Sequence, residues 1–128
     1  MSKTYIKAMY EADANDYTKC FADYWLEDIT GQLNLERDAS RKEITNALAR
    51  EWSFEQEYPV TIKSCKEIGR YDKSEYRIYY REEGMTEADY AAITEIAVVE
   101  VSYIAEGLRE GTEQLTCIKM DGNWYVMV

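Results

Sequence analysis

The chain has no histidine among its 128 residues, and it contains only one proline and six glycines. Without histidine, Ser-His-Asp triads, Cys-His pairs and histidine metal ligands are all excluded. With so little glycine and proline, no stretch has the composition of a flexible linker. We therefore expect one domain over residues 1–128 and no hydrolase that depends on a histidine base.

Cysteine is also scarce, and the three that are present, Cys20, Cys65 and Cys117, lie far apart in the sequence. No CxxC spacing occurs, so neither a zinc site nor a redox dithiol is expected. Nothing resembles a glycine-rich phosphate loop. We predict three reduced thiols that act as small apolar side chains, no bound metal and no cofactor.

Positive charge is the minority sign, because 15 Lys and Arg stand against 25 Asp and Glu, a formal net charge of −10. Such a chain is repelled by phosphate backbones and anionic lipid, so neither nucleic acid nor a membrane surface is an expected partner. The longest apolar run, residues 96–99, is far shorter than the ~20 residues of a transmembrane helix. No signal-peptide core follows Met1. We expect a cytoplasmic protein; the alternative is an extracytoplasmic domain trimmed of its signal or anchor.

The first half of the chain has the apolar spacing of helices, beginning near residue 4. An acidic stretch then breaks the pattern, and Asn15 or Asp16 would cap a second helix that runs to about residue 28. The residues from Ser40 to Glu43 form a capping-box pattern, which predicts the start of a third helix.

From residue 58 onward, apolar residues alternate with polar ones, which is typical of strands. Strands are predicted at residues 60–68, 76–81, 95–106, 112–120 and 124–128, with a short helix at 87–93. Helices followed by strands predict an α+β fold. In this fold about three N-terminal helices pack on one face of a curved antiparallel sheet of four to five strands.

Three local features occur in order along most of the chain. They are a Tyr- and Ala-rich opening helix broken by an acidic turn (residues 5–17), a long strand at 96–103 after a short helix, and the ending at 118–126. That ending is similar to the K-x-D-G-x-W hairpin that closes many nuclear-transport-factor-2-like domains, and the whole pattern resembles this superfamily of cystatin-like α+β cones. The resemblance implies a cone-like fold with a pocket between helices and sheet. In particular the chain looks like small bacterial domains of unknown function in this superfamily, many of them parts of lipoproteins.

The superfamily includes ketosteroid isomerases, polyketide cyclases and dehydratases as well as non-catalytic binding domains. Resemblance to the isomerases would imply a Tyr and a protonated Asp as oxyanion donors with an Asp base, and no motif assigns those residues here. The cyclases and dehydratases commonly rely on histidine, which this chain lacks. The first hypothesis is therefore a non-catalytic domain that binds a small molecule or a protein. The alternatives are a histidine-free isomerase or cyclase acting through Tyr and Asp, and a structural dimerisation module with a filled pocket.

Tyrosine is unusually frequent, with 12 residues against two phenylalanines. One interpretation is a pocket lined by phenols that would suit a small apolar or amphipathic ligand, since each offers an apolar body and a polar tip. The other is a core built with Tyr in place of Phe. Tyr10, Tyr17 and Tyr24 are seven residues apart from one another in turn, a spacing that would place them on one helical stripe. The candidate pocket residues are Tyr10, Tyr17, Tyr24, Tyr76, Tyr80, Tyr103, Gln114 and Thr116.

The last hairpin is predicted to have a three-residue loop, residues 120–122, that pairs Ile118 with Trp124. In this register Trp124 faces the helices, and both faces of the hairpin are apolar. Because a helix layer covers only one face, we expect a homodimer through the second; the alternative is a monomer with a partly exposed apolar face. The candidate dimer residues are Leu115, Cys117, Tyr125, Met127, Val98 and Ile104.

Overall fold

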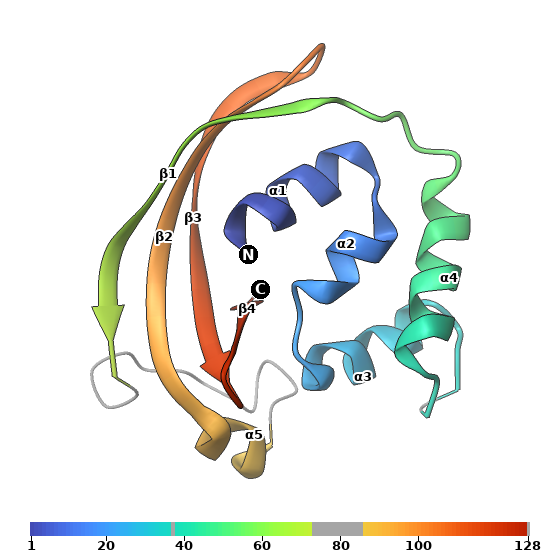
Figure 1. Cartoon of the computed structure of the whole chain (residues 1–128). Helices are drawn as coiled ribbons and strands as arrows, with labels where there is room; N and C mark the ends of the chain where they lie inside the picture. Colours follow the sequence, from blue (N-terminus) through green and yellow to red (C-terminus); the bar gives the residue numbers. More distant parts are fainter. Residues whose placement is uncertain (37, 73–85, 128) are drawn as a thin grey trace.

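The structure is a computed structural model that describes residues 1–36, 38–72 and 86–127 (Figure 1). The helices of this part are α1 (Ser2–Glu11), α2 (Ala14–Lys19), α3 (Asp23–Gln32), α4 (Arg41–Trp52) and α5 (Glu87–Ala92), and the strands are β1 (Val60–Tyr71), β2 (Ile93–Ala105), β3 (Arg109–Met120) and β4 (Asn123–Met127). Helices thus precede an antiparallel sheet, which confirms the predicted α+β class. The strand predicted at 76–81 lies outside the described residues. None of the helices described is long and apolar enough to cross a bilayer.

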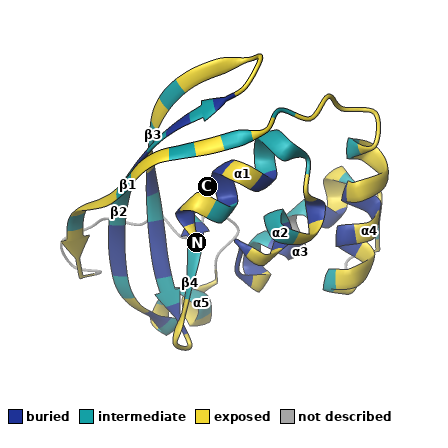
Figure 2. Cartoon of the chain, turned by 45° about the horizontal axis from the view of Figure 1, so that its top comes forward, coloured by how far each residue is buried: buried dark blue, intermediate teal, exposed yellow. Residues whose placement is uncertain are grey.

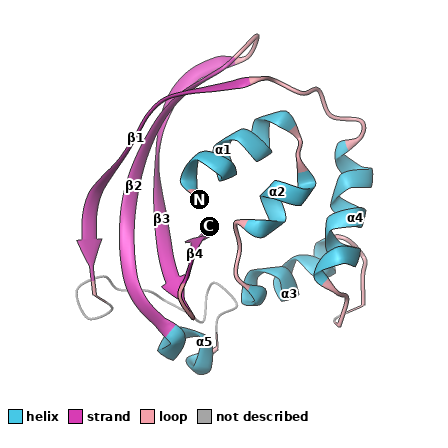
Figure 3. Ribbon diagram, viewed as in Figure 1, coloured by secondary structure: helices cyan, strands magenta, loops and turns pink. Residues whose placement is uncertain are grey.

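The strands pair with their neighbours in chain order, β1-β2-β3-β4, and all three pairings are antiparallel. The sheet curves, and α1 lies inside the curve (Figures 1 and 3). β1 shifts register twice, between Ile62 and Ser64 and between Glu67 and Gly69. Such irregularities bend a strand and increase its twist, so they favour the curvature. We call the side of the sheet toward α1 the inner face and the opposite side the outer face.

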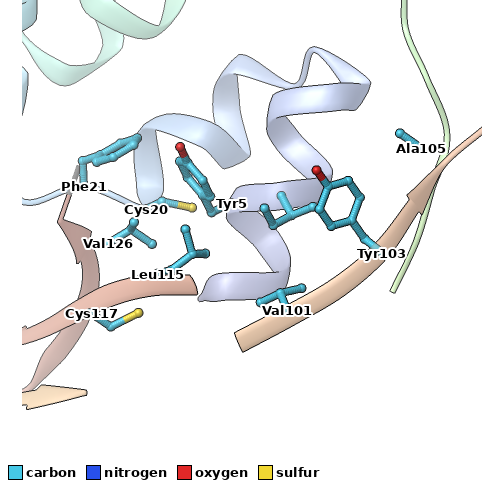
Figure 4. Close-up of a cluster of buried hydrophobic side chains, with 10 residues drawn as sticks. Tyr5, Cys20, Phe21, Val101, Tyr103, Ala105, Leu115, Cys117 and Val126 are labelled. Atoms are coloured by element: carbon cyan, nitrogen blue, oxygen red, sulfur yellow. The ribbon is translucent and has the colours of Figure 1, made fainter. Parts of the chain in front are cut away.

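The main core lies between α1 and the inner face. Tyr5 and Ile6 of α1 belong to one buried cluster with Val101, Leu115 and Val126 of the sheet (Figure 4). Burying an apolar side chain of this size contributes about 1.5–3 kcal/mol, so this cluster fixes α1 against the sheet. Figure 2 shows the same pattern, with buried residues along α1 and the strands and exposed residues on the far side of α4.

The helix predicted from residue 15 to about 28 is two helices, α2 and α3, because a tertiary hydrogen bond interrupts it. The backbone N–H of Val126 in β4 donates to the carbonyl oxygen of Cys20 at 2.7 Å. The Cys20 carbonyl oxygen therefore accepts from the edge strand β4 instead of continuing the helix. The cap of α2 is Asp13, whose carboxylate accepts from the N–H of Asp16 at 3.1 Å. The prediction of Asn15 or Asp16 as the cap was wrong.

Past Cys20 the chain itself covers part of the outer face. Ala22 and Tyr24 join a second buried cluster with four residues that alternate along the strands with those of the inner face: Ile93, Ile96, Ile118 and Met120. These four side chains are between 0% and 7% exposed. The apolar outer face is therefore smaller than the sequence predicted.

The hairpin between β3 and β4 has a two-residue turn, Asp121-Gly122, instead of the predicted three-residue loop. Both turn residues have positive φ, 51° and 83°, as a type I′ turn requires. Ile118 consequently pairs with Tyr125, not with Trp124. A slip of one residue exchanges the faces of a strand.

The register determines where the candidate dimer residues lie. Leu115 and Cys117 face inward and are only 8% and 4% exposed, within the cluster under α1. The sequence predicted both residues on the second face of the hairpin, and this prediction was wrong. Val98 and Ile104 alternate with inner-face residues along β2, and Met127 pairs with Thr116, which places all of them on the outer face.

Candidate functional site

A cavity of about 470 Å³ opens on the inner face of the sheet beside the first turn of α1. Its floor consists of small apolar side chains from β1, β2 and β3: Cys65, Ala97, Val99 and Cys117. Trp124 of β4 lines one wall, and Met1, Ser2, Lys3, Glu67 and Arg70 complete the lining. The volume is within the range of small-molecule sites.

The cavity exists because side-chain size changes along the inner face of β2 and β3. Where α1 packs, the inner face carries Val101, Tyr103 and Leu115, which fill the space under the helix. Further along the same face, Ala97 pairs with Cys117. These two small side chains leave the space beside the first turn of α1 open.

Arg70 lies over the indole ring of Trp124, with its guanidinium carbon 5.2 Å from the ring centroid. This is a cation–π contact, and it is reinforced by carboxylates on either side. Glu67 accepts from Nε of Arg70 at 3.0 Å and also from Nη2, while Glu95 accepts from Nη1 at 2.6 Å. Glu95 also pairs with Lys119 at 3.3 Å. Glu67 and Glu95 thus hold the guanidinium against Trp124, and Lys119 holds Glu95.

The ion pairs around Arg70 also change its acid–base properties and those of Glu95. Hydrogen bonds from Lys119 and from Arg70 lower the pKa of the Glu95 carboxyl. Hydrogen bonds to Glu67 and then to Glu95 raise the pKa of Arg70. Both shifts favour the charged forms, a cationic Arg70 and an anionic Glu95.

Two of the three cysteines, Cys65 and Cys117, line the cavity. The thiol of Cys117 lies 3.3 Å from the hydroxyl oxygen of Ser2. Burial raises the pKa of Cys117, and the contact with Ser2 lowers it to a smaller extent. Cys65 and Cys117 lie on strands separated by β2 and pair with different residues of it, Val101 and Ala97. Their separation therefore exceeds the ~9.5 Å of two strand spacings, which is already beyond the roughly 7 Å limit of a disulfide.

The third cysteine, Cys20, is buried, and its thiol donates to the carbonyl oxygen of Asp16 at 3.3 Å. Burial raises the pKa of Cys20 to about 11. All three cysteines are free. Within the described ranges no group of three or more His, Cys, Asp or Glu residues could hold a metal ion.

Of the described candidate tyrosines, Tyr10 and Tyr103 come into contact, but the predicted helical stripe of tyrosines is not formed. Tyr10, Tyr17 and Tyr24 belong to three different helices, so the predicted single stripe does not form. The stripe is broken by the chain reversal at Ala12, which has a φ of 56°, and by the interruption after Lys19. Among the described residues that line the cavity there is no tyrosine. Tyr76 and Tyr80 lie outside the described residues.

Two other candidates, Tyr17 and Tyr24, pack among apolar side chains away from the cavity. Tyr17 packs against Tyr5, Phe21, Trp25 and Trp52, with ring centroids 4.9–6.0 Å apart. Burial raises its pKa to about 12. Tyr24 is buried on the outer face.

Gln114 and Thr116 alternate with the inward-facing Leu115 along β3, so they lie on the outer face, away from the cavity. Gln114 is exposed and Thr116 is half-buried. Their predicted place in the pocket is not met, because the hairpin register puts the other set of β3 residues under α1.

Tyr103 is the centre of a partly buried polar group under α1. Its hydroxyl lies 2.8 Å from that of Tyr10 and donates to Oε1 of Glu113 at 3.1 Å. Tyr10 also lines a second hollow of about 310 Å³ with Met9, Trp52, Tyr58 and Leu108. The phenol–carboxylate pair therefore lies apart from the larger cavity.

The sequence did not predict that Arg70, Glu67 and Ala97 line the cavity. It also placed Cys117 on the second face of the hairpin, whereas Cys117 faces inward. Arg70 was missed because the strand was predicted to end at residues 68–69, whereas β1 continues to Tyr71. Alternation along β1 would have found it only if the bulge between Glu67 and Gly69 had been known.

Comparisons with protein-family models, with curated proteins and with solved structures found no match to this chain. Its function therefore has to be argued from the cavity and its surroundings.

Proposed function

We propose that this protein is a non-catalytic binding domain that holds a small molecule in the cavity between α1 and the inner face of the sheet. The observation that carries the proposal is an open volume of about 470 Å³ with an apolar floor and charged side chains at its opening. Binding sites for small molecules have this composition, in which apolar walls supply affinity and a few polar groups fix orientation.

The cavity supports a binding role better than a catalytic one. A histidine-free isomerase or cyclase would need a tyrosine hydroxyl and a desolvated carboxylate in the same pocket. Glu67 is the carboxylate among the described lining residues, and it is bound to Arg70. Tyr103 and Glu113 are close to each other but lie under α1 rather than in the cavity. The open volume likewise speaks against a structural module whose pocket is filled.

As part of this proposal, the domain belongs to the nuclear-transport-factor-2-like superfamily. Support comes from the order of helices before strands, from the curved antiparallel sheet and from the position of α1 inside the curve (Figure 1). A cavity on the inner face of such a sheet is where a cone-shaped domain would hold its ligand.

We also propose that two copies associate through the outer face. Val98, Ile104, Tyr125 and Met127 are half-buried on this face, and Ile68 in β1 is 44% exposed. A two-fold axis would let this apolar surface meet its own copy. Because Ala22 and Tyr24 already cover part of the face, the proposed interface is smaller than the sequence suggested.

Native mass spectrometry of the freshly purified protein tests the binding proposal. We expect a species heavier than the bare chain, whose extra mass is released on unfolding. Ala97→Leu should fill the floor and remove the extra mass, since Ala97 lines the cavity. Ala49→Leu is the matched control, because Ala49 is exposed on α4 and far from the lining.

Two outcomes would contradict the proposal. One is a folded protein that carries no ligand and takes up neither decanoate nor decan-1-ol, the two small amphipathic molecules chosen as probes. The other is extra mass that persists in Ala97→Leu as fully as in Ala49→Leu, with both variants giving the circular dichroism of the unmodified chain. Cys65→Leu, at a second position of the floor, repeats the test if Ala97→Leu does not fold.

A further inference from the structure

The opening of the cavity is cationic, although the protein as a whole is strongly acidic. Lys3 on α1 and Arg70 on β1 both line it, and Glu67 is the carboxylate among the described lining residues. The lining side chains therefore carry a net charge of +1, against −10 for the whole chain. Glu95 and Lys119, which flank Arg70 outside the lining, have opposite charges and cancel each other.

Arg70 retains hydrogen-bonding capacity. A guanidinium has five N–H donors. In the part of the chain that the structure describes, Nε and Nη2 each donate to Glu67 and Nη1 donates to Glu95. One N–H on each Nη atom is therefore left for another acceptor. The carboxylates already present hold the group in place against Trp124, so little side-chain entropy remains to be lost when a ligand binds.

Lys3 adds a second positive charge from another element, α1. No ion pair of Lys3 occurs within the described ranges, and the first turn of α1 contains no acidic residue. An ammonium group and a guanidinium from two separate elements thus border the same opening. A charge-assisted hydrogen bond to either one is about twice as strong as a hydrogen bond between neutral groups.

Below these charged groups the floor is apolar. Cys65, Ala97, Val99 and Cys117 present small aliphatic or thiol side chains, and Trp124 adds an aromatic wall. A water molecule occupies about 30 Å³ of liquid, so the cavity of about 470 Å³ has room for roughly 15 non-hydrogen atoms. An occupant that fits both regions has an apolar body of this size and a negative charge at one end.

We infer that the ligand of this cavity is an amphipathic carboxylate whose apolar body lies on the floor and whose carboxylate lies between Lys3 and Arg70. This inference rests on the proposed function and adds the chemical class of the ligand. An amphipathic cation would be repelled by the two positive side chains. A neutral alcohol could occupy the same floor but would leave the Lys3 ammonium without a counter-ion among the described residues, and Arg70 with only the carboxylates that already hold it.

Isothermal titration calorimetry with decanoate and decan-1-ol tests the inference, because the two probes share an apolar chain and differ in charge. We expect decanoate to bind at least about tenfold more tightly than decan-1-ol. Lys3→Gln should weaken decanoate binding by about tenfold and leave decan-1-ol unchanged. The matched control is Lys7→Gln, one helical turn further along α1 and outside the cavity lining, and it should change neither affinity.

The possible outcomes test the carboxylate inference and the binding proposal separately. Equal affinity for both probes, with both lost in Ala97→Leu, would overturn the carboxylate inference and leave the binding proposal standing. An equal loss of decanoate binding in Lys3→Gln and in Lys7→Gln would also overturn it, because the effect would then be one of overall charge. Binding of neither probe by the folded protein would contradict the binding proposal itself. If Lys3→Gln does not fold, Arg70→Lys replaces it, with the same expected preference and a smaller loss.

Discussion

The hydroxyl groups of Tyr10 and Tyr103 lie 2.8 Å apart and connect the last turn of α1 to β2. Since Tyr103 donates its proton to Glu113, Tyr10 is the donor to Tyr103. The Tyr103 side chain is fully buried, and this burial raises its pKa. The hydrogen-bonded group therefore fixes one end of α1 over the sheet, while the cavity opens at the other end.

Removing the two hydroxyls should have unequal effects on stability. Tyr103→Phe abolishes both hydrogen bonds and leaves the Tyr10 hydroxyl without its acceptor, so we expect a loss of about 1–3 kcal/mol. Tyr10→Phe abolishes one bond and should lower the free energy of unfolding by about 0.5–1.5 kcal/mol. Urea denaturation of the two variants measures both values. Equal losses, or the reverse order, would show that the hydroxyl chain does not form as described.

Gly111 makes room for the Tyr103 side chain across the strand pair. The two residues pair directly in the register of β2 and β3, and a Cβ at Gly111 would lie 3.0 Å from Oη of Tyr103 and 3.2 Å from its Cζ. Because Tyr103 is buried and cannot move away freely, Gly111→Ala should destabilise by about 1–3 kcal/mol. The loss should be smaller in the Tyr103→Phe background, where Oη is absent.

Gly31→Ala is the matched control for this substitution. Gly31 lies in α3, and a Cβ there would meet nothing within 4 Å. Alanine in a helix is about 0.5–1 kcal/mol more favourable than glycine, so this variant should gain stability. If Gly111→Ala is as stable as the unmodified protein, the close approach to Tyr103 is contradicted.

High pH should destabilise the protein through Cys20 and Tyr17. Burial raises their pKa values from 9.0 to about 11 and from 10.0 to about 12. Both groups are neutral when protonated, so above pH 9 the unfolded chain loses these protons before the folded chain does. The unfolded state then binds fewer protons, and the free energy of unfolding falls as pH rises through the window from 9 to 12.

Urea midpoints measured at pH 8, 9, 10 and 11 test this prediction. The midpoint should be constant below pH 9 and then decline. Cys20→Ala should reduce the part of the decline that begins near pH 9, to which the buried Cys117 also contributes, and keep the part that begins near pH 10, where Tyr17 titrates in the unfolded chain. A flat profile up to pH 11 would argue against the burial of these two groups.

The hairpin register predicts opposite results for two lysine substitutions. Met127 is half-buried on the outer face, so Met127→Lys should give a folded monomer if that face joins two copies. Leu115 is 8% exposed in the core, so Leu115→Lys should prevent folding, because an unpaired charge would be buried there. Sedimentation and circular dichroism distinguish these results. If the unmodified protein sediments as a monomer at tens of micromolar, the proposed dimer is wrong.

Local sequence patterns determined where several elements begin. The capping boxes that start at Ser40 and at Thr86 both form, with Glu43 and Asp89 as their reciprocal partners. The alternation of apolar residues likewise predicted β2 and β3 to within a few residues. These features depend on hydrogen bonds and spacings within a few residues of the chain, so the sequence alone was sufficient to locate them.

Tertiary contacts decided where α2 and α3 separate, which side chains face inward and where the cavity lies. The carbonyl of Cys20 separates α2 from α3 because it accepts from Val126, which comes 106 residues later in the numbering. The φ values of Asp121 and Gly122 set the register that turns Leu115 inward. The cavity requires Lys3, Arg70 and Trp124 to meet from three separate elements. The Asp121-Gly122 turn does have a local signal, although its two-residue length was not predicted. The Cys20–Val126 bond and the cavity have no local signal, because each depends on how segments far apart in the sequence come together.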